Sequence, residues 1–256
     1  MPSWDADRYL SFEDDRTRPA RDLLARVPDV GPSYVVDVGC GPGNSTRLLV
    51  ERWPEAVVVG IDSSPEMLAK ARGDLPGAEF VEADLRDWTP PRQVDVVFSN
   101  ATLQWVDDHP SILARLVSWL APGGVMAIQM PANFDAPSHV SMRQVAARSR
   151  WRSRLEGALR EAPVAAPQDY YEWLAPFGQV DIWRTEYFHT LHGDDPVFDW
   201  VSGTGLRPVL DRLDDGDAAA FSAEYSEELR KAYPRRADGT TLFPFRRIFL
   251  VLTTAP

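Results

Sequence analysis

The sequence predicts an α/β protein in which a doubly wound sheet of seven strands is combined with a helical cap. Two observations lead to this fold class. Residues 34–131 contain five short runs rich in Val, Ile and Phe, separated by helix-forming or turn-forming segments, which is the pattern of βαβ units. After Met130 the chain becomes mainly helical, interrupted by one long strand-like run before a final apolar strand. We therefore expect a single domain over 1–256 with a helical insertion before its last strand.

The elements of the first half follow from apolar runs that end at turn residues. A polar N-terminal stretch leads into a helix, and the sheet begins with the run that opens at Val35. The fourth helix of this half is expected to end at Ala121–Pro122–Gly123–Gly124, where proline and glycine cannot continue it. The expected strands are 35–38, 56–62, 79–84, 94–100 and 125–130, and the expected helices are 19–26, 46–53, one starting after Ser63, and 111–120.

The second half supplies two strands and several helices. We expect residues 1–135 to form a cofactor-binding core with an N-terminal lid, 136–240 a helical cap with the sixth strand, and 241–256 the last strand. The helices between the last two strands are expected to cover the strand ends and close a pocket. The expected strands are 180–191 and 245–254, and the expected helical segments are 138–162, 167–175, 196–201, 206–213 and 217–232.

A glycine-rich turn after the first strand is the most informative motif. Residues 35–45 place Gly39, Gly41 and Gly43 at alternate positions after a β-branched run, so backbone N–H groups can closely approach a ligand. The dinucleotide fingerprint needs a further glycine, and the chain has Asn or Thr at the corresponding positions. Asp37 lies in the strand end, where a carboxylate repels a pyrophosphate and attracts a cation. The alternative is a plain βα turn.

The second strand ends in an acid whose spacing from the glycine turn is informative. Asp62 follows Gly43 by nineteen residues, close to the roughly 20-residue spacing at which a βαβ unit places a carboxylate on a ribose. Ser63 and Glu66 form the pattern of a capping box, and Pro65 suits the first turn of the helix that follows. A simple turn-forming role for Asp62 is the alternative.

Composition excludes several function classes. The formal net charge is −11, so a nucleic acid would meet an unfavourable field. No apolar run approaches the ~20 residues of a membrane span, and the first residues show no secretory signal. The single cysteine, Cys40, fits a reducing cytoplasm. No metal-ligand spacing is present, so we expect a cytoplasmic protein with no metal, no membrane and no obligate protein partner.

Two more strand ends carry polar residues, and ligands bind at this edge of open α/β sheets. Asp84 ends the third strand and Asn100 the fourth. With the glycine turn and Asp62, this pattern resembles the class I S-adenosylmethionine methyltransferases, a Rossmann-like family with a mostly parallel sheet. The resemblance implies S-adenosylmethionine as cofactor, with Met67 against the adenine and Asp84 at its amino group. The residues expected to bind it are Asp37, Gly39, Gly41, Asp62, Ser63, Met67, Asp84, Leu85, Asn100 and Ala101.

The chain offers anion-binding residues rather than a general base. Its four histidines are scattered in sequence, while arginines occur in unusual surroundings, such as Arg207 in a Gly/Pro loop and Arg246–Arg247 in an otherwise apolar strand. A buried strand accepts arginine only when its charge is paired. A carboxylate acceptor, with a reference pKa near ~4, is already ionised at neutral pH and needs positioning only. We therefore expect no catalytic base.

Five segments make the resemblance more specific. They are 4–19, 100–105, 129–139, 203–208 and 243–247, and together they are similar to the bacterial trans-aconitate 2-methyltransferase family over essentially the whole chain. The resemblance implies that the monomethyl ester of trans-aconitate is formed. The sequence leaves open whether Arg246 or Arg247 faces the acceptor. The residues expected to bind the small polycarboxylate are Tyr9, Arg18, Gln104, Trp105, Gln129, Arg207 and Arg247.

Two other functions stay open at this point. The same fold could methylate another small or acyl-chain carboxylic acid or a natural-product hydroxyl, since nine Trp residues leave room for an apolar substrate. A module that only binds S-adenosylmethionine is the third hypothesis. Arginines of the middle helical region, such as Arg143 and Arg148, are expected on a solvated face.

Overall fold

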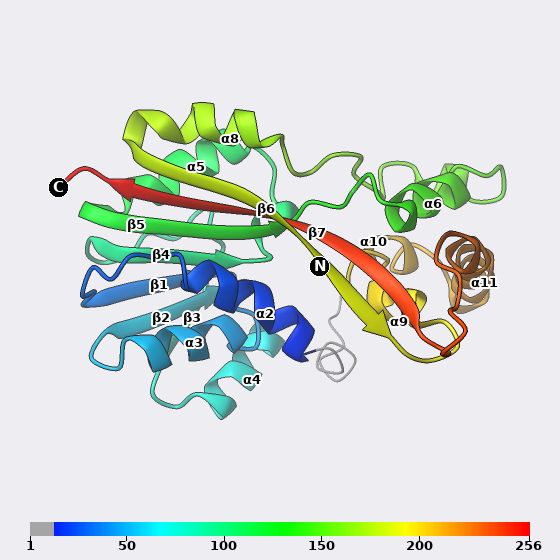
Figure 1. Ribbon diagram of the computed structural model, residues 1–256, viewed down its shortest axis with the longest axis horizontal. Helices are drawn as coiled ribbons and strands as arrows, with labels where there is room; N and C mark the ends of the chain where they lie inside the picture. Colours follow the sequence, from blue (N-terminus) through cyan, green and yellow to red (C-terminus); the bar gives the residue numbers. More distant parts are fainter. Residues whose placement is uncertain (1–12) are drawn as a thin grey trace. The chain divides into compact units, whose positions relative to one another are not determined.

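The computed structural model describes residues 13–256, with side chains from Thr17 onward. Its sheet has the strand order β3-β2-β1-β4-β5-β7-β6 (Figure 1). β1 pairs in parallel with β2 and β4, β2 with β3, and β4 with β5, whereas β7 runs antiparallel to β5. The predicted mostly parallel, doubly wound sheet is confirmed. The strands are β1 (Tyr34–Val38), β2 (Val57–Asp62), β3 (Glu79–Glu82), β4 (Val94–Asn100), β5 (Leu120–Pro131), β6 (Gly178–Leu191) and β7 (Thr241–Thr254).

The chain forms two compact units. The first, called the sheet unit, comprises Asp14–Pro131, Val164–Thr185 and Arg247–Pro256, and the second, called the helical unit, includes Ala132–Pro163 and Glu186–Arg246. The division falls inside β6 and β7, so each long strand contributes residues to both units. The single-domain layout expected from the sequence stays a prediction.

The helices are divided between these two units. In the sheet unit α3 contacts β1 and β2, α4 contacts β2 and β3, and α5 contacts both β5 and α8. The sheet unit holds α2 (Glu13–Leu24, from Asp14 on), α3 (Asn44–Arg52), α4 (Pro65–Asp74), η1 (Leu103–Trp105), α5 (His109–Ser118), α8 (Pro167–Leu174) and η2 (Ala175–Phe177). The helical unit holds α6 (Pro137–Ala146), α7 (Arg152–Leu155), α9 (Pro196–Ser202), α10 (Arg207–Leu210) and α11 (Asp215–Ala232).

Several predicted boundaries are wrong for identifiable reasons. α2 begins before Pro19, which removes one helix N–H without ending the helix. β5 begins at Leu120, because the expected Pro–Gly–Gly stop forms an irregularity within the strand pairing instead of a separate loop. β7 begins at Thr241 and contains Pro244. That proline is tolerated because β5 pairs with β7 only from Arg247 onward.

The strand order determines where the sheet can bind a ligand. β1 lies between β2 and β4. The chain first builds one side of the sheet, from β1 through β2 to β3, and then crosses back to place β4 on the other side of β1. In doubly wound sheets this switch point, at the carboxyl ends of the strands, is the ligand-binding position. β1 is buried along its whole length, as expected for a strand covered on both faces.

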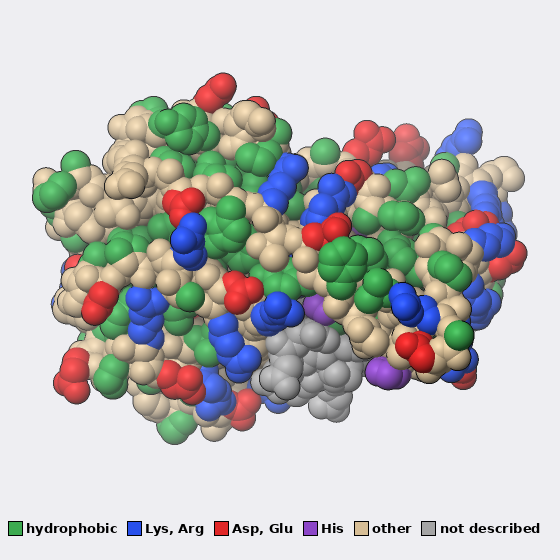
Figure 2. Space-filling view, viewed as in Figure 1, with side chains coloured by type: hydrophobic (Ala, Val, Ile, Leu, Met, Phe, Trp, Pro, Cys, Tyr) green, Lys and Arg blue, Asp and Glu red, His purple; other side chains and the backbone are tan. Residues whose placement is uncertain are grey.

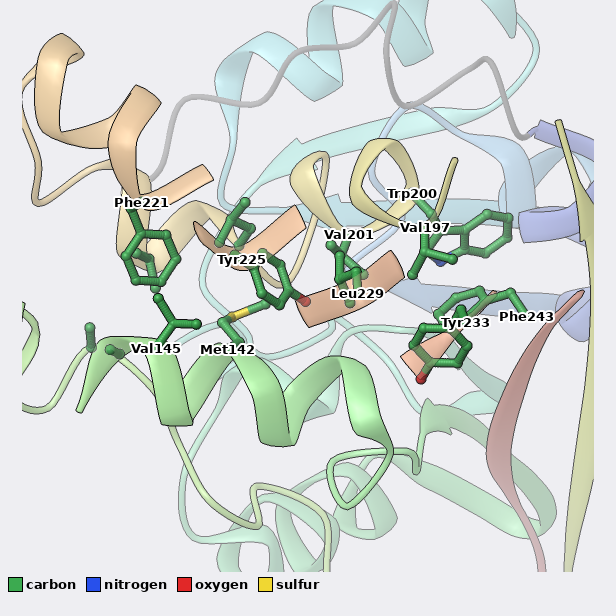
Figure 3. Close-up of a cluster of buried hydrophobic side chains, with 14 of the residues drawn as sticks. Met142, Val145, Val197, Trp200, Val201, Phe221, Tyr225, Leu229, Tyr233 and Phe243 are labelled. Atoms are coloured by element: carbon green, nitrogen blue, oxygen red, sulfur yellow. The ribbon is translucent and has the colours of Figure 1, made fainter. Parts of the chain in front are cut away.

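The helical unit has its own hydrophobic core. Figure 3 shows Met142 and Val145 of α6 facing Phe221 and Tyr225 of α11. Trp200 of α9 joins the same cluster and lies beside the phenylalanines of β7. Burying an aromatic or aliphatic side chain of this size contributes about 1.5–3 kcal/mol, so this cluster gives the insertion a stable core of its own.

The surface carries mixed charges. On the face drawn in Figure 2, Lys and Arg side chains are interspersed with Asp and Glu. Arg148 forms ion pairs with Glu224 and Glu228, both at 2.8 Å, which confirms its predicted solvated position. Arg143 differs, because its Nη1 donates to the Phe134 carbonyl at 2.9 Å in a partly buried site. Among the helices of residues 13–256, none has the length and apolar character that a membrane crossing requires.

Candidate active site

The glycine turn after β1 combines a tight steric fit with an open cradle. Gly39 and Gly41 have φ values of +69° and +53°, which favour glycine. A Cβ added to Gly39 would lie 2.2 Å from side-chain atoms of Thr102. A Cβ added to Gly41 would meet nothing within 4 Å. Gly39 is therefore needed for packing, whereas Gly41 leaves open space beside its backbone that a ligand can use.

Asp62 ties the second strand end to this turn. Its Oδ2 accepts from the Gly41 N–H and its Oδ1 from the Ser64 N–H, both at 2.9 Å. The helix cap is Ser64, whose Oγ accepts from the Met67 N–H at 3.3 Å. The predicted cap at Ser63 is wrong, because Asp62 forms an Asx turn that moves the helix start one residue onward. Met67 is buried on the first turn of α4.

Asp37 lies behind the turn and is fully buried in β1. Its Oδ2 accepts from the hydroxyls of Ser45 and Thr46, each at 2.7 Å, and thereby holds the first turn of α3. Burial raises the pKa of this carboxyl to about 6 even though both hydroxyl donors lower it. Its Oδ1 has no hydrogen-bond partner among the described residues. Its expected contact with a cationic ligand stays a prediction.

β3 ends at Glu82 and not at Asp84 as expected, and the loop that follows it is held by two arginines. Arg86 donates from its backbone N–H and its Nε to Asp84 Oδ1, at 2.9 and 2.8 Å, and these bonds hold the pKa of Asp84 below its usual range. Arg115 of α5 donates to the carbonyls of Leu85 and Trp88, at 3.2 and 2.7 Å. No local signal in the sequence indicates Arg115, because it lies about 30 residues beyond the loop that it supports.

A strained turn follows the fourth strand. Ala101 has φ of +58°, unusual for a residue with a side chain, and its N–H donates to the Gln129 carbonyl at 2.9 Å. Thr102 Oγ1 donates to the Gly39 carbonyl at 3.1 Å, and Gln104 Nε2 donates to the Ala101 carbonyl at 2.5 Å. The first two bonds connect the turn to β5 and to the glycine loop, and the third closes the turn on itself, so the surrounding structure holds Ala101 in its strained conformation.

Three neighbouring strands bring Asn100, Gln129 and Arg247 together. Asn100 is the register partner of Gln129 across β4 and β5, and Gln129 Oε1 accepts from Arg247 Nη1 at 3.3 Å across β5 and β7. Gln129 is fully buried and Arg247 is 4% exposed. Among the described residues, Gln129 Nε2 and Asn100 Oδ1 have no hydrogen-bond partner. The row can therefore take a polar group that supplies these bonds.

The structure distinguishes the two adjacent arginines of β7. Arg247 lies on the buried face with Gln129, whereas Arg246 is half-buried and pairs with Asp135 in the helical unit. Successive strand residues point to opposite faces, so the two arginines lie on opposite faces of β7, and here only the face of Arg247 is buried at this position. This finding favours Arg247 as the residue that meets the acceptor.

The remaining residues that were predicted to bind the acceptor lie on separate elements of the chain. Trp105 lies on η1 in the sheet unit with 45% of its surface exposed. Arg18 is exposed on α2, and Arg207 opens α10 in the helical unit. Tyr9 lies outside the described residues. Their part in binding an acceptor stays a prediction.

Comparison with known proteins agrees with the fold. Residues 35–124 match the family model described as a methyltransferase domain. The YcgJ protein of Bacillus subtilis has the same fold, with a TM-score of 0.59 and 14% identity, covering 93% of this chain and 99% of that chain. A phosphoethanolamine N-methyltransferase of Haemonchus contortus gives 0.56 and 15%, covering 93% of this chain and 53% of that one. Fold and site together define a class I methyltransferase.

Full-length relatives give a narrower family. Proteins named trans-aconitate 2-methyltransferase from Azoarcus sp. strain BH72 and from Streptomyces avermitilis are each 52% identical to this chain. The alignments cover 98% of this chain and 99% and 97% of those proteins. The chain belongs to the trans-aconitate 2-methyltransferase family.

Proposed function

We propose that this chain transfers a methyl group from S-adenosylmethionine to one carboxylate of trans-aconitate and so forms a monomethyl ester. The printed names of the full-length relatives support this acceptor. The single structural observation that carries the proposal is the buried row of Asn100, Gln129 and Arg247, in which an arginine is combined with an unsatisfied amide donor.

The donor fits the edge formed by β1, β2 and β4. S-adenosylmethionine supplies a methyl group on a positively charged sulfur. The open space beside Gly41 lets a ligand approach the backbone, and Asp62 lies next to it at the end of β2. The carboxylate of Asp62 has further lone pairs for hydroxyl donors such as those of a ribose. Leu85, held from α5 by Arg115, offers a buried apolar side chain for the adenine.

The acceptor is held as an anion. Arg247 provides a planar set of N–H donors that matches a carboxylate, and Gln129 Nε2 provides a further donor whose hydrogen bonds are unfilled among the described residues. A trianion approaching a chain of net charge −11 needs such a local cationic site. The acceptor oxygen forms the new O–CH₃ bond as the C–S bond breaks, and no proton has to be removed. Orientation alone can account for about 7–11 kcal/mol of the barrier.

The test compares two adjacent arginines of one strand. Arg247→Lys keeps the charge but removes the planar donor set, and we expect kcat/KM for trans-aconitate to fall by about 30-fold or more, equivalent to roughly 2 kcal/mol. Arg246→Gln is the matched control and is expected to leave kcat/KM within about twofold. Formation of S-adenosylhomocysteine and of the ester is followed by mass spectrometry, and S-adenosylhomocysteine binding by calorimetry.

Three results would reject the proposal. The first is that the wild-type protein forms no ester from trans-aconitate. The second is that Arg247→Lys and Arg246→Gln have equal kcat/KM. The third is that calorimetry detects no heat of binding when the donor is titrated into the protein. Long-chain acids and phenols are assayed beside trans-aconitate. Methylation of one of them, with none of trans-aconitate, would identify an enzyme with another acceptor. A cytoplasmic location, which the single cysteine favours, belongs to the same proposal.

A further inference from the structure

A buried histidine connects the turn after β4 to a distant helix. His109, the first residue of α5, is 6% exposed. Its Nε2 lies 2.9 Å from the Leu103 carbonyl and its Nδ1 lies 2.6 Å from the Tyr170 hydroxyl. Tyr170 belongs to α8 and is fully buried. All three residues lie in the sheet unit.

The partners determine which atoms carry the hydrogens. A carbonyl oxygen can only accept, so His109 Nε2 donates to Leu103. In the neutral ring Nδ1 is then an acceptor and receives the hydroxyl hydrogen of Tyr170. The Ala165 N–H donates to the same hydroxyl oxygen at 3.3 Å, which keeps its lone pairs turned toward the loop before α8. Both nitrogens of His109 are thus engaged by the protein, so this histidine is no candidate base.

The carbonyl held by His109 belongs to the turn that carries two predicted acceptor residues. Leu103 opens η1, which continues with Gln104 and Trp105. The Leu103 carbonyl also accepts from the Val106 N–H at 3.1 Å. Two donors therefore hold one carbonyl of this three-residue helix. Isolated 3₁₀ turns of this length have little stability of their own, so the orientation of η1 depends on such external bonds.

We propose that His109 and Tyr170 are positioning residues for the acceptor, acting through the Leu103 carbonyl to hold the Gln104–Trp105 edge of the site. The assignment rests on the proposed function, because it takes Gln104 and Trp105 to face the acceptor. Burial raises the pKa of Tyr170 to about 12. The hydroxyl therefore stays protonated at neutral pH and can donate to His109 Nδ1.

The experiment removes one hydroxyl from each of two neighbouring tyrosines. Tyr170→Phe deletes the donor to His109, and Tyr171→Phe is the matched control because Tyr171 is 56% exposed on the same helix. We expect Tyr170→Phe to lower kcat/KM for trans-aconitate by about tenfold, through a higher KM, a lower kcat or both. Small misplacements far from the chemistry have effects of this order or larger. The Kd of S-adenosylhomocysteine is expected to change by less than about twofold, and Tyr171→Phe to behave as wild type.

Substitution of His109 supplies a second readout. Gln places an amide donor near the former Nε2, whereas Asn does not reach it, so His109→Gln is expected to retain more acceptor kcat/KM than His109→Asn. The double variant with Tyr170→Phe and His109→Asn is expected to lose no more than His109→Asn alone, because the two residues act as one unit. All assays are run at a temperature where each variant is folded by circular dichroism.

The outcomes separate this proposal from the proposed function. If wild type forms no ester, the proposed function fails before any variant is compared. If wild type is active and Tyr170→Phe retains both acceptor KM and kcat, the positioning role is refuted. A Tyr170→Phe variant that loses donor and acceptor binding equally refutes it as well, because a general loss of structure would have that effect. Additive losses in the double variant would contradict the linkage between the two residues.

Discussion

Asp37 provides a sharp test of the site's electrostatics. Its carboxyl is fully buried in β1, and burial raises its pKa from 3.8 to about 6. A native pKa above the unfolded pKa means that the folded protein binds this proton more tightly. The favourable contribution to the free energy of unfolding is therefore fully present below pH 3.8 and is lost as pH rises through about 6. Over the whole range it amounts to about 3 kcal/mol, because each tenfold change in proton affinity is worth about 1.4 kcal/mol.

The measurement compares wild type with Asp37→Asn, which cannot titrate and can still accept from Ser45 and Thr46. About 1.4 kcal/mol of the effect falls between pH 5 and 7.5, above the sequence pI of 4.8. Urea unfolding of the ligand-free proteins should show the wild type losing this amount relative to Asp37→Asn over that interval. Asp29→Asn, in an exposed loop, is the matched control. Parallel profiles for wild type and Asp37→Asn would refute the reasoning.

The remaining predictions concern the donor site. Gly39→Ala should lower the free energy of unfolding more than Gly41→Ala, because both positions have positive φ but only Gly39 would place its Cβ 2.2 Å from Thr102; equal losses by urea unfolding would contradict this. Gly41→Ala should instead weaken S-adenosylhomocysteine binding by about tenfold or more, since the new methyl group fills the cradle, and an unchanged Kd by calorimetry would exclude the cradle. Arg115→Ala should raise the Kd of S-adenosylhomocysteine by about fivefold or more, because the Leu85 and Trp88 carbonyls lose their donor. Arg115→Lys should recover part of the lost affinity. An Arg115→Ala variant with wild-type affinity would contradict the role of this loop.

Most of the sheet was predictable because its signals are local. β-branched runs, glycine turns and acids at strand ends report on neighbouring residues, and the strand order follows from the connection rules of βαβ units. The cofactor residues predicted around Gly41, Asp62 and Asn100 lie at adjacent strand ends in the structure. The boundary errors came from competing local choices, such as Asp62 bonding to the Ser64 N–H and moving the helix cap from Ser63.

Contacts between distant segments could not be predicted from these signals. Nothing near His109 in the sequence indicates Tyr170, which is 61 residues away, and nothing near Leu85 indicates Arg115. The choice between Arg246 and Arg247 depends on the register of β7 against β5. A shift of one residue in that pairing would exchange the two side chains between faces.

The sequence by itself determined the fold class, the family and the cofactor, because these depend on residue type and spacing along the chain. Only the tertiary structure decided which arginine is buried beside Gln129, that Asp37 is held by two hydroxyls with a raised pKa, and that a histidine links α8 to the turn after β4. Register, burial and long-range hydrogen bonds arise when the strands and helices pack. They are properties of the assembled chain, and no local pattern of residues encodes them.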